Sequence, residues 1–371
     1  MNRERPPCPL PALLLLTITA TGCGHSRPPD AEPAQRLDPI HIHATRDGER
    51  LDLDAYDASE LFERAGGNLR SGSCQTAVKI YDRLCEEFSG SPLVPLALYN
   101  RGLCLDELER YQEAAASYGR MVRDFPGSQD VTDALFRMAG SFEAMEAWDQ
   151  VVEALDRLLS EHPDLGRAER IEALARKGSA LLEMDRVDDA RLALEAASRT
   201  HRIGRGIAPS DSNFYYSMAE FKLAEIVHDA MRQEEIPSDE SILEEHLERK
   251  AGLLLDAQRL YTKVIRIGHP HWAAAAAYRI GALYHHLWKD MLAAPPPEDL
   301  DEEEREIYQE ILREKIRVLL KKAVLQWERT LKLASRLGLD NKWVESTQRD
   351  LDEIRDILVL EKSGEGAIEE D

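Results

Sequence analysis

The 371-residue sequence lacks the short motifs that mark the common classes of nucleotide-binding and hydrolytic enzymes. It contains no G-x-x-x-x-G-K phosphate loop, no G-x-G-x-x-G turn, no G-x-S-x-G elbow and no H-E-x-x-H helix. Six of its 11 histidines come in close pairs without cysteine or carboxylate at ligand spacing, whereas zinc needs three or four converging ligands. We therefore expect no catalytic residues, no cofactor and no bound metal.

Cations are scarce relative to anions. Lysine and arginine total 47 against 69 aspartates and glutamates, which gives a net charge of -22. Nucleic acids and anionic membrane surfaces are bound through clustered cations. The sequence therefore predicts neither of these as a partner.

Long apolar runs are also missing from the amino terminus. The apolar stretch over residues 12–20 is too short for a bilayer, which takes ~20 helical residues. Arg3 and Arg5 precede this stretch, and the small residues Thr21 and Gly22 follow it, immediately before Cys23. This order is typical of a signal peptide, which we place at residues 1–22. The alternative is an ordinary secretory signal with an incidental cysteine.

The string Ala20-Thr21-Gly22-Cys23 resembles the bacterial lipoprotein box. The resemblance implies that Cys23 is lipidated and becomes the first residue of the mature chain. Gly24, rather than aspartate, follows the cysteine, which by the sorting rule of that family implies the outer membrane. We expect a Gram-negative protein on the periplasmic face of this membrane, attached through its lipid alone. Residues 23–56, rich in Pro, Asp, Arg and His, are expected to be a flexible tether.

Three further cysteines remain after processing, which allows one internal disulfide at most. Cys74 and Cys85 lie eleven residues apart on one expected helix and so cannot pair with each other. Either could meet Cys104 on the next helix. Burial of all three as small apolar residues is equally compatible with the sequence.

One pattern recurs at steps of 37, 37 and 39 residues. A small residue is followed after 12 positions by Ala or Val, after 16 by a bulky residue and after 19 by another apolar residue. The small residues are Ala65, Gly102, Ala139 and Gly178, and the last copy continues with Ala190, Leu194 and Ala197. A fixed period with helical spacing inside it predicts stacked helix pairs that share one continuous core.

These residues resemble the tetratricopeptide repeat, in which the small residue lets two helices cross closely. The resemblance implies an all-α fold, a right-handed superhelical solenoid. Residues 57–203 would form regular repeats, 204–360 extended helical pairs with a capping helix, and 361–371 an acidic tail. In the second part we expect helices over 212–232, 242–267, 272–293, 302–337 and 343–360, which makes six pairs and a cap.

The concave groove is where such an array would bind a partner. Aligning the repeats on their small residue places aromatic residues and fork-shaped donors on the inner face: Tyr99, Asn100, Phe136, Arg137, Arg176, Tyr216, Tyr278 and Arg279. Arginine binds carboxylates with two parallel hydrogen bonds, so a protein segment carrying carboxylates is expected there. Packing of these aromatics between neighbouring helices is the alternative, because inner-face and core positions are adjacent on a helix.

Together these features predict a lipid-anchored periplasmic scaffold that binds envelope proteins, either outer-membrane β-barrels or periplasmic machinery. The layout resembles repeat lipoproteins of barrel assembly and of cell-division coordination, and those of myxobacterial gliding and secretion machinery. Two other classes remain open. One is a module for a small anionic ligand over residues 204–300, and the other is a peptidoglycan-active enzyme, for which no separate catalytic unit is apparent.

Overall fold

The computed structural model describes residues 41–47, 50–203, 212–297 and 299–368. The signal region, Cys23 and the first part of the expected tether lie outside these residues. The chain divides into two compact units, Met1–Asp57 and Ala58–Asp371.

The described part of the first unit is a β-hairpin. Strand β1 (His41–Asp47) pairs with β2 (Arg50–Tyr56) in an antiparallel register that sets Ile42 opposite Ala55. The tether prediction was therefore wrong from residue 41 onward. The sequence carries the reason, because apolar and polar residues alternate on both sides of the two residues Gly48 and Glu49, and glycine first in a two-residue step is a hairpin signal.

The described part of the second unit consists of helices. The first eight are α1 (Ala58–Arg70), α2 (Cys74–Glu87), α3 (Val94–Glu107), α4 (Tyr111–Asp124), α5 (Val131–Ala144), α6 (Trp148–Glu161), α7 (Arg167–Glu183) and α8 (Val187–Ile203). The remaining five are α9 (Ser212–Gln233), α10 (Glu240–Ile267), α11 (Pro270–Ala293), α12 (Glu302–Leu337) and α13 (Lys342–Ile368). The elongated helices predicted for the carboxy-terminal pairs are present. Helix α13, however, runs to Ile368 through the expected tail, because glycine, unlike proline, weakens a helix without blocking it.

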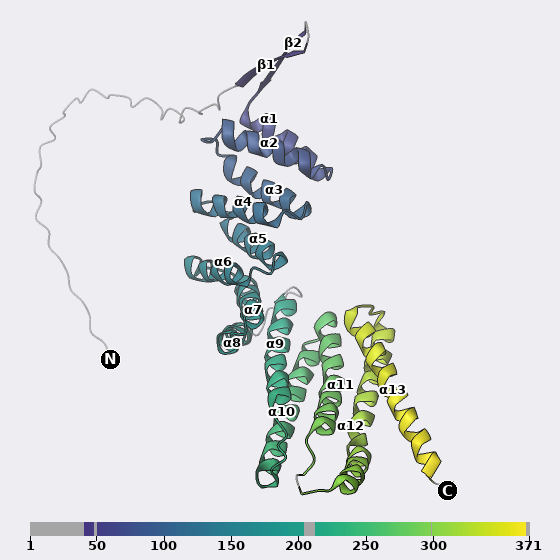
Figure 1. Cartoon of the computed structure of the whole chain (residues 1–371). Helices are drawn as coiled ribbons and strands as arrows, with labels where there is room; N and C mark the ends of the chain where they lie inside the picture. Colours follow the sequence, from purple (N-terminus) through teal and green to yellow (C-terminus); the bar gives the residue numbers. More distant parts are fainter. Residues whose placement is uncertain (1–40, 48–49, 204–211, 298, 369–371) are drawn as a thin grey trace, which may run out of the picture. The chain divides into compact units, whose positions relative to one another are not determined.

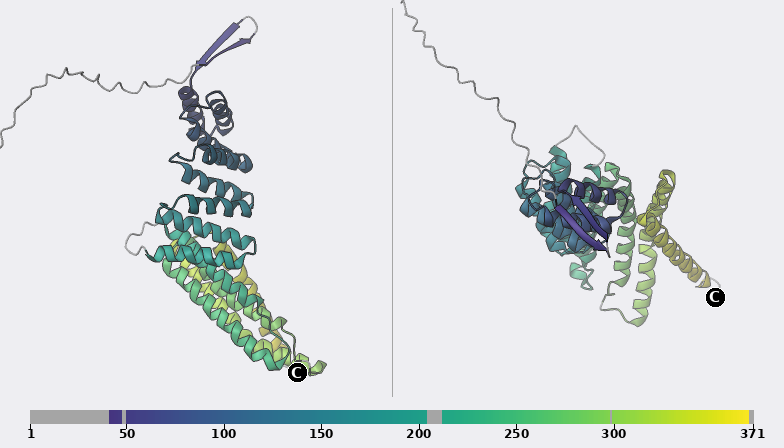
Figure 2. Two further views of the ribbon diagram at one scale, coloured as in Figure 1. Left: turned by 90° about the vertical axis from the view of Figure 1, so that its left-hand side faces the viewer. Right: turned by 90° about the horizontal axis from the view of Figure 1, so that it is seen from above.

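Each of these helices packs against the next one along the chain, as Figures 1 and 2 show. First helices of neighbouring pairs also touch, as in α7 with α9 and α9 with α11. This nearest-neighbour stacking is that of a repeat solenoid, and it confirms the predicted fold class.

The small residue of each repeat sits where the two helices of a pair cross. A Cβ added to Gly102 would come within 2.4 Å of the Tyr118 ring, and one added to Gly178 within 2.6 Å of Leu194. In the pair formed by α11 and α12, a Cβ added to Gly281 would come within 2.1 Å of the Trp327 indole nitrogen. These contacts are too short for any side chain, so the repeat pattern reports a real steric limit.

The turn inside each regular pair repeats as well. Gly72, Glu109, Glu146 and Asp185 have φ angles of 76°, 57°, 54° and 57°. They follow the same 37, 37 and 39 steps as the small residues. The left-handed conformation is therefore a property of the repeat, although only the first copy uses the glycine that adopts it without strain.

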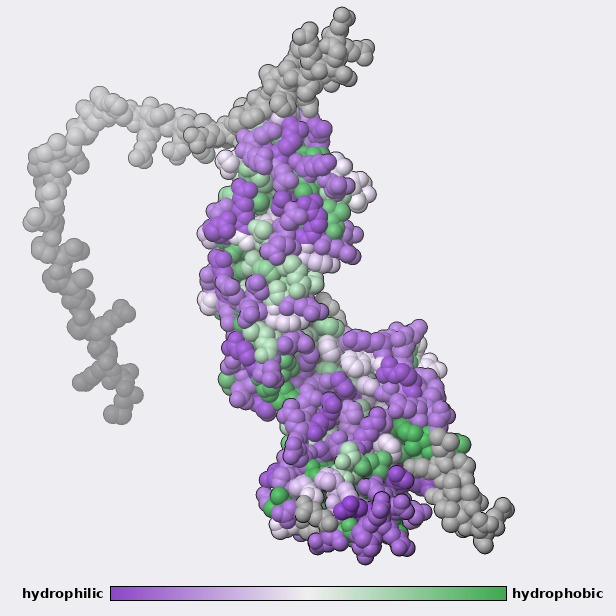
Figure 3. Space-filling view, in the orientation of Figure 1, coloured by the Kyte–Doolittle hydropathy of each residue, from purple (hydrophilic) through white to green (hydrophobic). Residues whose placement is uncertain are grey.

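The interior is apolar and continuous along the array, whereas hydrophilic residues cover most of the face seen in Figure 3. Cys74, Cys85 and Cys104 are buried free thiols. Burial raises the pKa of Cys104 to about 12, and the neighbouring thiol of Cys74 adds to this shift. Among the described helices, none is long and apolar enough to cross a membrane.

Candidate functional site

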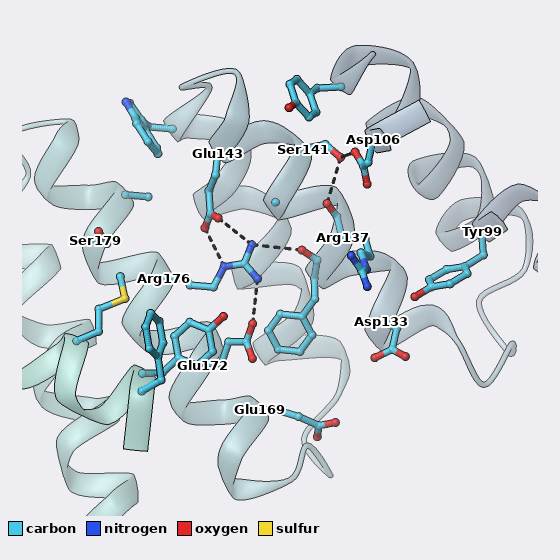
Figure 4. Close-up of a pocket in the computed structure, with 18 residues that line it drawn as sticks. Tyr99, Asp106, Asp133, Arg137, Ser141, Glu143, Glu169, Glu172, Arg176 and Ser179 are labelled. Atoms are coloured by element: carbon cyan, nitrogen blue, oxygen red, sulfur yellow. Dashed lines mark hydrogen bonds and ion pairs between the residues drawn. The ribbon is translucent and has the colours of Figure 1, made fainter. Parts of the chain in front are cut away.

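A cavity of about 880 Å³ opens on the inner face of the second to fifth helix pairs. Its walls come from the first helices α3, α5, α7 and α9, with side chains from the starts of α4 and α6 (Figure 4). The aromatic lining comprises Tyr99, Tyr111, Phe136, Trp148, Phe214 and Tyr215. The charged lining comprises Asp106, Asp133, Arg137, Glu143, Glu169, Glu172 and Arg176. We refer to this cavity as the groove.

The structure brings together half of the residues that the sequence predicted for a binding groove. Tyr99, Phe136, Arg137 and Arg176 line the groove. The other four, Asn100, Tyr216, Tyr278 and Arg279, are not part of its wall.

Arg176 is bound on all sides by its own chain. Its Nε and Nη2 atoms lie 2.8 and 3.1 Å from the two oxygens of Glu143, and Nη1 lies 3.1 Å from Glu172. Nη2 also donates to the carbonyl of Phe136 at 3.3 Å, and the guanidinium sits over the Phe136 ring. Burial alone would lower the pKa of Arg176, but the carboxylate of Glu143 shifts it upward. The side chain links α5 to α7. Its guanidinium donors are therefore occupied within the chain and are not free for a partner, contrary to the sequence-based expectation.

Arg137 is more accessible. Arg137 is an exposed residue, and Figure 4 shows the Tyr99 hydroxyl turned toward its guanidinium. Burial lowers and the Tyr99 phenol raises the pKa of this arginine, with a net upward shift. Among the described residues no carboxylate within 4.0 Å pairs with Arg137, which makes it the available cation of the groove.

Asp106 ties the upper end of the groove together. Its carboxylate accepts hydrogen bonds from the Tyr118 hydroxyl at 2.8 Å and from the Ser141 hydroxyl at 2.7 Å. Burial and this carboxylate together raise the pKa of Tyr118. Asp106 therefore links α3, α4 and α5 and sets the spacing between the second and third pairs.

Two of the residues outside the groove pack between helices. Tyr216 is 7% exposed, and its ring stacks on His201 at 3.7 Å between centroids. Asn100 lies beside the buried Tyr81. For Tyr216 the packing alternative describes what the structure shows.

Tyr278 and Arg279 belong to a separate cluster in the carboxy-terminal part. Tyr278 stacks on Trp327 and donates to Asp350 at 2.6 Å. Arg279 donates to Glu225 at 2.7 Å and lies over the Trp343 ring. Like Arg176, this arginine is used within the fold.

The expected site does not include the acidic residues of the groove, although a signal for them exists in the sequence. Asp106 and Glu143 both stand four positions after their repeat's small residue, and Asp133 and Glu172 both stand six before it. Asp133 and Glu172 thus stand about one helical turn before the aligned inner-face positions, and Asp106 and Glu143 about two turns after them. Extending the alignment that far would have found carboxylates on both sides of the aromatic positions.

Tetratricopeptide repeat family models match residues 68–129 and 133–165. These two segments are similar to tetratricopeptide repeats. No curated protein matches it, and neither family match indicates a catalytic family.

Solved structures of repeat proteins are similar over much of the chain. A tetratricopeptide repeat protein from Parabacteroides merdae is 15% identical, with 80% of this chain and 98% of that chain covered and a TM-score of 0.38. The quorum sensor NprR from B. thuringiensis is 10% identical, with 81% and 87% covered and a TM-score of 0.43. MamA from Desulfovibrio magneticus is 15% identical, with 53% and 94% covered and a TM-score of 0.36. These similarities concern the repeat fold and carry no information on what this chain binds.

Proposed function

We propose that this tetratricopeptide protein is a lipid-anchored periplasmic scaffold that binds a segment of a protein partner in the groove. Its partners would be outer-membrane β-barrels or periplasmic machinery for envelope biogenesis, motility or secretion. The groove itself is the observation that carries the proposal, because it combines an extended aromatic wall with charged groups on the inner face of stacked repeats. The lipoprotein-box resemblance at Cys23 supports the location.

An 880 Å³ open groove lined by six aromatic residues suits a polypeptide better than a small anion. Its lining carries five carboxylates and two guanidiniums, one of which is already neutralised by Glu143 and Glu172. A small anionic ligand would face a surplus of like charge. The region proposed for such a ligand contributes Phe214, Tyr215 and Met218 to the wall.

Crosslinking followed by affinity recovery from detergent-solubilised envelopes tests this function. The native chain is compared with Cys23→Ser and with the double variant Tyr99→Ala, Arg137→Ala. We expect a defined set of envelope proteins with the native chain, a reduced set without the anchor, and none with the double variant at unchanged helical content. The matched control is Arg191→Ala with Leu192→Ala, which removes an arginine and an exposed apolar side chain from α8, outside the groove. Equal recovery by the groove variant and its control would overturn the groove as the binding site.

A further inference from the structure

The charge of the groove indicates what kind of segment it accepts. The Arg176 hydrogen-bond donors in the groove are bonded within the chain, whereas some carboxylate acceptors are not. The Arg176 guanidinium has its donors directed to Glu143, Glu172 and the Phe136 carbonyl, and its side chain is only 10% exposed. A carboxylate on a partner would have to displace one of these internal bonds. Breaking a buried ion pair costs more than an exposed replacement returns.

Acceptors, in contrast, remain open to the groove. Asp133 is exposed in the first turn of α5, and within the described part of the chain its carboxylate has no hydrogen bond or ion pair. Glu169 is exposed in the first turn of α7, where one oxygen, Oε2, accepts from the Gly166 amide at 2.8 Å. Its second oxygen has no partner among the described residues. These two helix starts thus present carboxylate oxygens from adjacent repeats along the same face.

The aromatic wall, like the open carboxylates, favours a positively charged side chain on the partner. Arg176 lies over the Phe136 ring with 5.8 Å between the guanidinium carbon and the ring centroid, so the groove already contains one cation–aromatic contact. Tyr215 and Trp148 also line the groove. Glu172 lies near the Tyr215 hydroxyl, and this hydroxyl stays protonated and neutral. Burial, followed by the charge of Glu172, raises the pKa of Tyr215 to about 12. A lysine or arginine beside such rings gains from both the carboxylates and the ring faces.

We infer that the occupant of the groove is a basic protein segment, whose lysine or arginine side chains meet Asp133 and Glu169 while its apolar side chains cover the aromatic wall. This inference rests on the proposed function and reverses the charge that the sequence predicted for the partner. Arg137 is placed to hydrogen-bond a backbone carbonyl of the bound segment, since a carbonyl needs a donor but brings no net charge.

Two fluorescein-labelled peptides test the charge of the occupant on the full chain. They share one length and the same tryptophans and prolines, and carry at every third position either arginine or glutamate. We expect the arginine peptide to raise the fluorescence anisotropy in a saturable way, with an affinity that falls as salt is added. The glutamate peptide should not bind. Equal binding of both, or binding of the glutamate peptide alone, would overturn the inference.

A chain with net charge -22 could attract any cation, so the test needs a local control. Asp133→Lys should weaken binding of the arginine peptide by about tenfold or more, as expected for the loss of a charge-assisted hydrogen bond. Asp188→Lys makes the same charge change at another exposed first-turn acid, in α8 outside the groove. It should leave the affinity within about twofold. Equal weakening by both substitutions would show that the attraction is diffuse and would overturn the local site.

Failure of this inference can be told apart from failure of the proposed function. If the arginine peptide does not bind but Tyr99→Ala with Arg137→Ala still abolishes recovery of envelope partners, the groove binds a segment of other chemistry. If the peptide binds in the groove and recovery does not depend on it, the site for a basic segment exists and the scaffold function does not use it.

Discussion

The Arg176 guanidinium forms a two-pronged ion pair with the Glu143 carboxylate across neighbouring repeats, at 2.8 and 3.1 Å. Arg176→Met should therefore lower the free energy of unfolding by about 3 kcal/mol, because it leaves Glu143 and Glu172 without their shared partner in a half-buried setting. Urea unfolding followed by circular dichroism measures this change. Arg157→Met is the matched control, since its pair with Glu161 is exposed on a single helix, and it should cost about 0.5 kcal/mol or less. Similar losses for the two variants would mean that Arg176 does not brace the repeats.

The crossing of Gly281 with Trp327 leads to a second prediction. Gly281→Ala would place a methyl group 2.1 Å from the indole nitrogen of a fully buried tryptophan that donates to the Tyr278 carbonyl. We expect a loss of about 2–3 kcal/mol in stability. Gly252→Ala is the control, because its Cβ meets nothing within 4 Å on the exposed face of α10. That substitution should stabilise the helix by about 0.5–1 kcal/mol, so the thermal midpoints of the two variants should move in opposite directions.

The fold could be predicted from the sequence because its determinants are local and periodic. The bounds expected for the helix over 302–337 agree with those of α12, since proline ends the preceding segment and Asp301 with Glu304 forms a capping box at the start. The hairpin of residues 41–56 was not predicted, because its alternation of apolar and polar residues is short and lies in a segment rich in charged residues. The carboxy-terminal end of α13 was not predicted either, because its glycine and acidic residues weaken a helix without ending it.

The groove was predicted less well, for a physical reason. Periodicity tells which face of a helix a residue occupies, but not how charged side chains on neighbouring helices satisfy one another. Arg176 lines the groove and Arg279 does not, yet both are bound by carboxylates of their own chain, Glu143 and Glu225, which lie 33 and 54 positions away in the sequence. Such pairings depend on rotamers and on interhelical distance, which one sequence does not reveal.

The repeated left-handed turn gives a third prediction. Glu146 has a φ of 54°, a conformation that costs a residue with a Cβ roughly 1 kcal/mol. Glu146→Gly should therefore stabilise the array by up to about 1 kcal/mol, because glycine adopts this conformation without strain, as Gly72 does at the equivalent position of the first pair. The control Glu153→Gly lies on the exposed face inside α6 and should destabilise by about 1 kcal/mol. Loss of stability in both variants would contradict the assignment of strain to this turn.

The fourth prediction concerns a buried chain of hydrogen bonds between α9, α10 and α11. The Tyr261 hydroxyl donates to Glu225, so its oxygen accepts from Nδ1–H of His228 at 3.0 Å. Nε2 of His228 then accepts from Nδ1–H of His286 at 2.9 Å. This arrangement requires a neutral His228, because a proton on its Nε2 would face the Nδ1–H of His286.

Acid should therefore destabilise this part of the array. Burial, followed by the neighbouring His286, lowers the pKa of His228 from 6.5 to about 3, and burial, followed by Arg232, lowers that of His286 to about 4. Below pH 6.5 the unfolded chain binds protons that the folded chain does not, so the free energy of unfolding falls with pH. Between pH 6.5 and about pH 5 the loss from His228 is about 2 kcal/mol. Urea titrations at these two pH values should show it in the native chain and in His162→Gln, a histidine at the end of α6. The loss should shrink in His228→Gln, and an unchanged pH dependence in that variant would place the acid sensitivity elsewhere in the chain.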